Sequence, residues 1–130
     1  MTRGHKMIKV EAIVREERME DVKDALRAID VRGITVSQVM GCGTQLGYTH
    51  RVRGSKVAMN MLPKAKFEIV VSNEDWAEKT VDAIVHAAYT GEPGDGKVFW
   101  YPIDHAVRIR TGEKDIEAIT PAPLPVVEEE

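Results

Sequence analysis

The sequence passes twice through the same succession of patterns, strand then helix then strand. Met7 to Val14 alternates apolar with polar residues, which predicts a half-buried strand, and Met19 to Ile29 carries its apolar residues at helical spacing. Ile34 to Met40 is rich in β-branched residues and is predicted to be the second strand. Because each of these elements buries only one face, the chain has to pack helices against a sheet.

The second pass starts with a third predicted strand, Ala65 to Val71, and continues into a helix whose start, Ser72 to Asp75, resembles a capping box. The inward face of this helix is predicted to contain Ala77, Val81, Ile84, Val85 and Ala88. Val98 to Tyr101 and Ala106 to Arg110 are predicted to supply the last strand or strands. The doubled β-α-β order predicts an α+β, ferredoxin-like double β-α-β sandwich. Helices cover one face of such a sheet, so we expect oligomerisation to bury the other.

A glycine-rich segment separates the two passes. Gly41 to Gly54 holds four glycines and few core-forming residues, which predicts a long exposed loop over about residues 41–55. Long loops in compact domains are usually functional or disordered. Residues 120–130 hold three prolines and end in three glutamates, so we expect a single domain over residues 1–119 and a disordered tail.

The composition excludes several classes of protein. A chain of 130 residues with a net charge of −3 fits one globular domain and argues against nucleic acid as the main partner. A single cysteine, Cys42, excludes an intrachain disulfide and a cysteine-rich zinc site. There is no long apolar span. We therefore expect a cytoplasmic protein that does not insert into a membrane.

The stretch from Thr90 to Gly112 combines glycines with cations. Gly94 and Gly96 let the backbone adopt dihedrals that other residues avoid and come close to an anion, with Lys97 beside them. In an extended strand Arg108 and Arg110 would leave the same face, while Val107 and Ile109 would point into the core. This pattern predicts a polyphosphate site.

A second interpretation of the same stretch stays open. The glycines can simply belong to a helix-to-strand turn, and the arginines to a solvated strand. The spacing matches neither a Walker A loop nor a GxGxxG fingerprint, so it does not decide between the two.

Five groups of residues occur in collinear order: Gly41 to Gly47 with Gln45, Arg53-Gly54, Leu62 to Val71, Thr90 to Phe99, and Arg108 to Gly112. Together they resemble the PII signal-transduction proteins of nitrogen metabolism, over about Lys9 to Gly112. The resemblance implies a homotrimer that binds ATP or ADP in the clefts between subunits. It also implies that the long loop docks on target proteins.

The resemblance implies a role for particular residues in nucleotide binding. These are Thr35, Gly41, Gly43, Glu68, Val70, Thr90, Gly94, Asp95, Gly96, Lys97, Arg108 and Arg110. Three of them, Lys97, Arg108 and Arg110, would hold the phosphates, and the amides of Gly94 and Gly96 would line them. Four others would lie near the adenine and ribose, namely Thr35, Glu68, Val70 and Thr90.

The resemblance also implies a second ligand, 2-oxoglutarate, bound with Mg²⁺. Gln45 would contact both the ion and the acid, Gly47 would belong to the same site, and Lys64 would pair with the far carboxylate. Mg²⁺ prefers six oxygen ligands and takes several from phosphates, so MgATP with open positions can chelate a 2-oxo acid. Completing that shell would fix the loop in one conformation, as a sensor requires.

The loop departs from the family pattern in several places. Val57 stands where many members carry a modified tyrosine, and Ser55 matches a serine that is phosphorylated in cyanobacterial members. Tyr48, Arg51 and Arg53 are the loop residues that we expect to face a partner. Thr44 and Leu46 replace common basic residues, which leaves the preference between ATP and ADP open.

These observations favour a non-catalytic regulator that controls an ammonium transporter, or nitrogen-metabolism enzymes and their regulators. Two alternatives stay open. One is a PII-like nucleotide sensor with a different ligand or partner, and the other is a slow ATPase or phosphotransferase on the same fold. The enzyme interpretation lacks an obvious base or nucleophile beside the phosphate cations.

Overall fold

The computed structural model describes residues 7–43 and 60–120. Its elements in chain order are β1 (Met7–Arg15), the 3-10 turn η1 (Glu16–Arg18), α1 (Met19–Ala28), β2 (Thr35–Gly43), β3 (Asn60–Val71), α2 (Glu74–Ala88), β4 (Gly96–Ile103) and α3 (Ile116–Ile119). In these residues no helix is both long and apolar enough to span a membrane.

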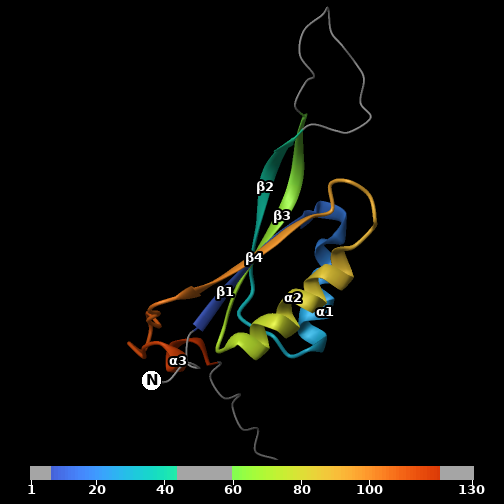
Figure 1. The fold of residues 1–130 in the computed structure, drawn as a ribbon. Coiled ribbons are helices and arrows are strands. Elements are labelled where there is room, and N and C mark those ends of the chain that lie inside the picture. The colour runs from blue at the N-terminus through green and yellow to red at the C-terminus, as the bar shows by residue number, and fades with distance from the viewer. Residues whose placement is uncertain (1–6, 44–59, 121–130) are drawn as a thin grey trace, which may run out of the picture.

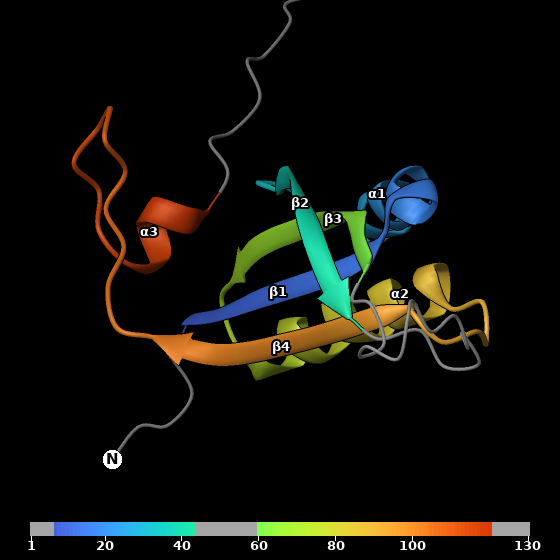
Figure 2. The same cartoon turned by 90° about the horizontal axis from the view of Figure 1, so that it is seen from above.

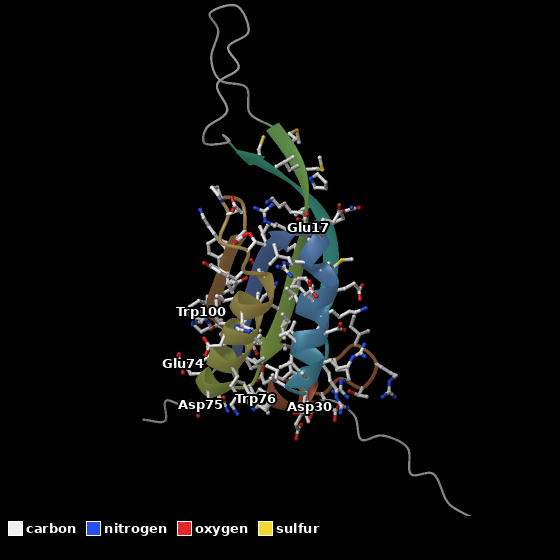
Figure 3. The ribbon with its side chains drawn as sticks, turned by 90° about the vertical axis from the view of Figure 1, so that its right-hand side faces the viewer. Glu17, Asp30, Glu74, Asp75, Trp76 and Trp100 are labelled. Atoms are coloured by element: carbon white, nitrogen blue, oxygen red, sulfur yellow. The ribbon has the colours of Figure 1, made fainter. Side chains whose placement is uncertain are left out.

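The four strands form one antiparallel sheet in the order β2-β3-β1-β4. Helices α1 and α2 lie side by side on one face of it (Figures 1 and 3). The two strands of each β-α-β unit are separated by a strand of the other unit. The predicted ferredoxin-like α+β fold is confirmed.

The core lies between the helices and the sheet. The alternation of β1 is confirmed, because Val10, Ala12 and Val14 are buried. Phe67 of β3 and Leu26 of α1 are both fully buried in the same core cluster. Burying a side chain of this size contributes about 1.5–3 kcal/mol, so this layer stabilises the whole sandwich.

Helix α2 differs from its prediction at its start and on its inward face. Its N-cap is Asn73, whose side chain accepts a hydrogen bond from the Trp76 amide at 2.9 Å, and not Ser72. Val85 is 50% exposed, so its predicted burial is wrong. Thr80 is buried instead because its hydroxyl donates to the Trp76 carbonyl at 2.7 Å and leaves no unpaired polar group.

Strands β2 and β3 extend further than predicted. The prediction that the loop begins at Gly41 is wrong, because Gly41–Gly43 continue β2 and Asn60–Pro63 begin β3. Pairing between the two strands satisfies these backbone groups despite the glycines. The rest of the predicted loop lies outside the described residues, as do its members Gln45, Gly47, Tyr48, Arg51, Arg53 and Ser55. The predicted tail, from residue 121 on, also lies outside them.

The other face of the sheet carries no helix (Figures 1 and 3). Lys9 pairs there with Glu68 at 2.9 Å and with Glu11 at 3.4 Å, and the Tyr101 hydroxyl donates to Glu11 at 2.7 Å. Phe99 pairs with Glu11 in the register and is also exposed. We call this surface the open face. It combines a charged network with aromatic side chains.

Trp100 points to the opposite side from Phe99 and Tyr101. It pairs with the buried Val10 at the edge of the sheet, where α2 covers it only in part, and it remains half exposed (Figure 3).

Candidate functional site

The turn from Thr90 to Gly96 joins α2 to β4, and we call it the glycine turn. Gly91, Gly94 and Gly96 all have positive φ angles, of 90°, 103° and 106°. The predicted unusual dihedrals are therefore confirmed. A Cβ on Gly96 would lie 1.8 Å from the carbonyl oxygen of Ile13, so only glycine lets β4 approach β1 here.

Asp95 holds the glycine turn closed. Its carboxylate accepts hydrogen bonds from the Thr90 amide at 2.8 Å, from the Gly91 amide at 2.9 Å and from the Thr90 hydroxyl. The guanidinium of Arg15 adds a bond from Nε at 2.9 Å. Asp95 was assigned to the nucleotide, but in this structure its oxygens serve the turn itself.

These hydrogen bonds shift the acid equilibrium of Asp95. The Thr90 hydroxyl first, then the Thr90 amide and the Arg15 guanidinium, hold the pKa of the Asp95 carboxyl well below its usual range. Asp95 in turn raises the pKa of Arg15, because its carboxylate accepts a hydrogen bond from the guanidinium. The pair therefore stays charged at neutral pH.

Lys64 reaches the same place from β3. Its ammonium donates to the carbonyl oxygen of Gly94 at 2.7 Å. Its stem covers Gly41 of β2, where an added Cβ would lie 3.1 Å from Lys64 Cγ. The structure thus brings together Gly41, Lys64 and the glycine turn.

A second group of predicted residues lies elsewhere. Thr35, Glu68 and Val70 line a half-open hollow of about 440 Å³ together with Arg108. Lys9, Arg32, Gly33, Ala118 and Ile119 complete its walls. The hollow joins a carboxylate, several cations and apolar surface, as an adenosine moiety would need.

The predicted strand over Arg108 and Arg110 is wrong. Arg108 opens a hairpin turn, in which its amide donates to the Glu113 carbonyl and the Gly112 amide donates to the Arg108 carbonyl, both at 2.8 Å. Arg110 lies within this turn, so the two guanidiniums do not share a strand face. Between the end of β4 and residue 120, the described chain forms one isolated β-bridge, Val107↔Lys114, outside the four strands of the sheet.

The apolar residues of this hairpin do not reach the core either. Val107 is 59% exposed and Ile109 is 97% exposed, so their predicted inward orientation is wrong. No sheet neighbour stands beside them to form a buried face. The same hairpin therefore presents Ile109 and Arg110 to the outside.

Arg108 is held by the end of the described chain. Its Nε donates to the Ala118 carbonyl at 3.3 Å, and its second terminal nitrogen donates to the carbonyls of Glu117, Ala118 and Thr120. The remaining nitrogen pairs with Glu113 at 3.1 Å. All three guanidinium nitrogens thus have partners within this one chain.

The predicted nucleotide residues therefore form two groups within one subunit. The glycine turn and Lys97 lie at the start of β4, whereas the segment carrying Arg108 follows its end (Figures 1 and 2). On β3, Lys64 of the first group and Glu68 of the second are four residues apart, which is about 13 Å along a strand.

Arg15 is a site residue that the sequence did not reveal. It lies 80 residues from Asp95 in the sequence. A charged residue at the end of an alternating strand has the pattern of an ordinary surface residue. Only the register, in which Arg15 opposes Lys64 and Val14 opposes Gly96, brings it to the turn.

Within residues 7–43 and 60–120, no group of three acidic, histidine or cysteine side chains is arranged to hold a metal ion. Gln45, the residue predicted to contact Mg²⁺, lies outside these ranges.

Comparison with known proteins gives one consistent family. The family model for nitrogen regulatory protein P-II matches residues 7–113. The chain is 53% identical over 113 residues to the nitrogen regulatory protein P-II of Synechocystis, covering 87% of this chain and all of the relative. It is 49% identical over 110 residues to that of Rhizobium etli, covering 85% of this chain and 97% of the relative.

Two solved structures extend the comparison. A complex of B. subtilis GlnK with ATP matches with a TM-score of 0.73 and 36% identity, covering 90% of this chain and 99% of that one. Arabidopsis thaliana PII bound to citrate matches with a TM-score of 0.69 and 40% identity, covering 88% and 92%.

Proposed function

The chain belongs to the nitrogen regulatory protein P-II family, and we propose that it is a cytoplasmic, homotrimeric sensor of adenine nucleotides and 2-oxoglutarate. Its family membership and its role as a regulator rather than an enzyme were predicted from the sequence, and both are confirmed. Binding of ATP or ADP would set the conformation of the loop that follows β2. That loop would control nitrogen-assimilation targets.

One observation carries the proposal for nucleotide binding. The phosphate-type group around Lys97 and the adenosine-type hollow around Glu68 lie apart in one subunit. A nucleotide that uses both would span two subunits, with the glycine turn of one copy facing the hollow of the next. The structural match to a GlnK–ATP complex supports nucleotide binding.

The open face supports a trimer. Phe99 and Tyr101 are 49% and 40% exposed there, which is unfavourable for aromatic side chains in water. A sheet face of this kind gains free energy when further copies cover it. Burial would also shield the ion pair between Lys9 and Glu68 from solvent.

The second ligand is proposed on Lys64 and two loop residues, Gln45 and Gly47. An ammonium group has three N–H donors, and among the described residues Lys64 uses one for the Gly94 carbonyl, so a carboxylate can take the others. Gln45 would complete the coordination of Mg²⁺ on bound ATP. 2-Oxoglutarate would then bind only after the nucleotide.

The loop carries the proposed contact with the target. Tyr48, Arg51 and Arg53 would face an ammonium transporter or a nitrogen-metabolism enzyme, and phosphorylation of Ser55 would add negative charge beside the two arginines. Cationic side chains on an exposed segment suit carboxylates at the target surface.

Calorimetric titration of the purified full-length protein tests the function. We expect ATP and ADP to bind with micromolar affinity, and 2-oxoglutarate to bind only when ATP and Mg²⁺ are both present. AMP is the matched control, because it lacks the phosphates that Lys97 and Arg108 would hold. Equal affinity for AMP, or binding of 2-oxoglutarate without nucleotide, would contradict the proposal.

Substitutions separate the second ligand from the first. Gln45→Ala should retain ATP and lose 2-oxoglutarate, because it removes an oxygen ligand of the ion and no nucleotide contact. Lys64→Ala should lose 2-oxoglutarate as well, and because Lys64 also bonds the Gly94 carbonyl, its ATP affinity is measured in the same experiment. Unchanged affinity for the acid in both variants would contradict this part of the proposal.

A further inference from the structure

Two neighbouring carbonyl oxygens of the glycine turn are held by cations from other strands. The Pro93 carbonyl accepts a bond from a terminal nitrogen of Arg15 at 2.8 Å, and the Gly94 carbonyl accepts one from Lys64 at 2.7 Å. Arg15 additionally bonds Asp95 through Nε at 2.9 Å. The turn is thus fixed from outside as well as by its own hydrogen bonds.

The two cations approach from the same side. Arg15 and Lys64 are opposite each other in the β1–β3 register. A side chain on Gly94 would begin 3.4 Å from the Arg15 nitrogen and 3.9 Å from the Lys64 nitrogen. Both carbonyl bonds must therefore point toward one small region of space.

Because these two carbonyls are fixed, peptide geometry also fixes the direction of two amide N–H groups. In a trans peptide the carbonyl of one residue and the N–H of the next point in opposite directions, and the described peptides contain no cis bond. Holding the carbonyls of Pro93 and Gly94 on one side therefore turns the N–H groups of Gly94 and Asp95 to the other. The positive φ of Gly94 permits this succession of peptides.

Two adjacent amides aimed the same way form a binding surface for an anion. The amides of Thr90 and Gly91 donate to Asp95, and that of Glu92 donates to the Thr90 hydroxyl. The N–H groups of Gly94 and Asp95 point away from Arg15 and Lys64 instead. This pair differs from the sequence prediction, which assigned Gly94 and Gly96 to the phosphates.

We propose that Arg15 is a positioning residue of the nucleotide site, which sets the direction of the Gly94 and Asp95 amides toward the phosphates without contacting them. The inference rests on the proposed function. Arginine suits this role because one planar group bonds Asp95 and the Pro93 carbonyl at once, through donors of fixed relative direction. A lysine keeps the charge but cannot make both bonds in that geometry.

The test compares Arg15→Lys and Arg15→Gln with Arg18→Lys and Arg18→Gln in the full-length protein. Arg18 is the matched control, because it lies beside the start of the turn, bonded to Asp21 at 3.1 Å and to the Tyr89 carbonyl at 3.5 Å, and has no bond to residues 93–95. ATP affinity is measured by calorimetry, melting temperature by scanning calorimetry, and exchange of the Thr90 and Gly91 amide hydrogens by mass spectrometry or NMR.

We expect both Arg15 variants to bind ATP about 10-fold or more weakly, because neither replacement can bond Asp95 and the Pro93 carbonyl at once. Amide exchange should rise at Thr90 and Gly91 with little change in melting temperature. The Arg18 variants should stay within about 2-fold of wild type, as expected for an exposed pair.

Three outcomes would overturn the inference. Wild-type ATP affinity in Arg15→Lys would show that the planar guanidinium with its two simultaneous bonds is not required. An equal loss of ATP affinity in Arg18→Gln would show that any positive charge near the turn has the same effect. A wild-type protein that binds no adenine nucleotide would overturn the proposed function first and the inference with it, whereas the first two outcomes would leave that function intact.

Discussion

The two regions predicted to hold phosphates are prepared for a ligand to very different degrees. The glycine turn is fixed by Asp95, Arg15 and Lys64, and no change in its backbone is needed to present its outward amides. The hairpin around Arg108 is folded on itself, and its guanidinium already bonds the chain's own oxygens. One region is preorganised, and the other is already occupied.

This difference predicts where the cost of binding falls. A preorganised group loses little conformational freedom on binding, so nearly all the free energy of its contacts contributes to affinity. Arg108 has to exchange partners within the chain for phosphate oxygens, so only the surplus of the new bonds contributes. The hairpin is therefore the part of the site through which affinity can be adjusted.

The largest expected effect is on the preorganised region. Gly96→Ala should destabilise the fold by about 2–4 kcal/mol, because the new Cβ meets the Ile13 carbonyl at 1.8 Å and φ is positive. Denaturant unfolding of the purified protein measures the change.

Gly112→Ala is the matched control from the hairpin. It also has a positive φ, of 78°, but nothing lies within 4 Å of its Cβ position. Its cost should stay near the 1–2 kcal/mol of backbone strain, so roughly half that of Gly96→Ala. If the two substitutions cost the same, the close approach of β4 to β1 is not what requires Gly96.

The next largest effect concerns affinity for ATP. Lys97→Ala should weaken binding by about 10- to 150-fold, since it removes a charged hydrogen bond worth about 1.5–3 kcal/mol. Arg108→Ala should weaken binding less, because only the surplus over its bonds within the chain is lost. The proposed trimer should remain intact by light scattering. Lys23→Ala, on the exposed face of α1, serves as the control. Normal affinity in either variant would remove that residue from the site.

The strands and helices could be predicted because their signals are local. The alternation of β1 and the helical spacing of α1 depend on one buried face each, and both are observed. Val85 was misplaced because its apolar side chain suits the pattern better than Thr80, and only the threonine's bond to the Trp76 carbonyl makes its burial affordable.

The site residues divide in the same way. Glycines with unusual dihedrals could be predicted at the turn, since Gly-rich segments indicate such backbone. The role of Arg15 could not, because it depends on a strand register between residues 80 positions apart. The hairpin at Arg108 also escaped prediction, since Arg108 and Ile109 fit an alternating strand that has no neighbour in the sheet to pair with.

The response to acid provides a third, intermediate test of the preorganised region. The folded-state pKa of Asp95 is depressed, so its carboxylate stabilises the fold above its unfolded pKa of about 3.9. That stabilisation should be lost as pH falls through the lower folded pKa. Wild type should therefore exceed Asp95→Asn in melting temperature near pH 7, and the difference should shrink below about pH 4.

A difference between wild type and Asp95→Asn that stayed constant between pH 7 and pH 3 would show that charge is not what Asp95 contributes.

The smallest expected effect tests whether the hairpin adjusts affinity. Glu113→Gln removes the carboxylate that competes with phosphate for Arg108, so ATP should bind about 2- to 5-fold more tightly, the range of an exposed ion pair. Glu117→Gln removes the same charge from α3 but keeps the carbonyl oxygen that Arg108 contacts, so it should leave affinity nearly unchanged. If both variants gained equally, net charge would explain the change. A gain in Glu113→Gln alone would mean that the partners already holding Arg108 set the affinity of the completed site.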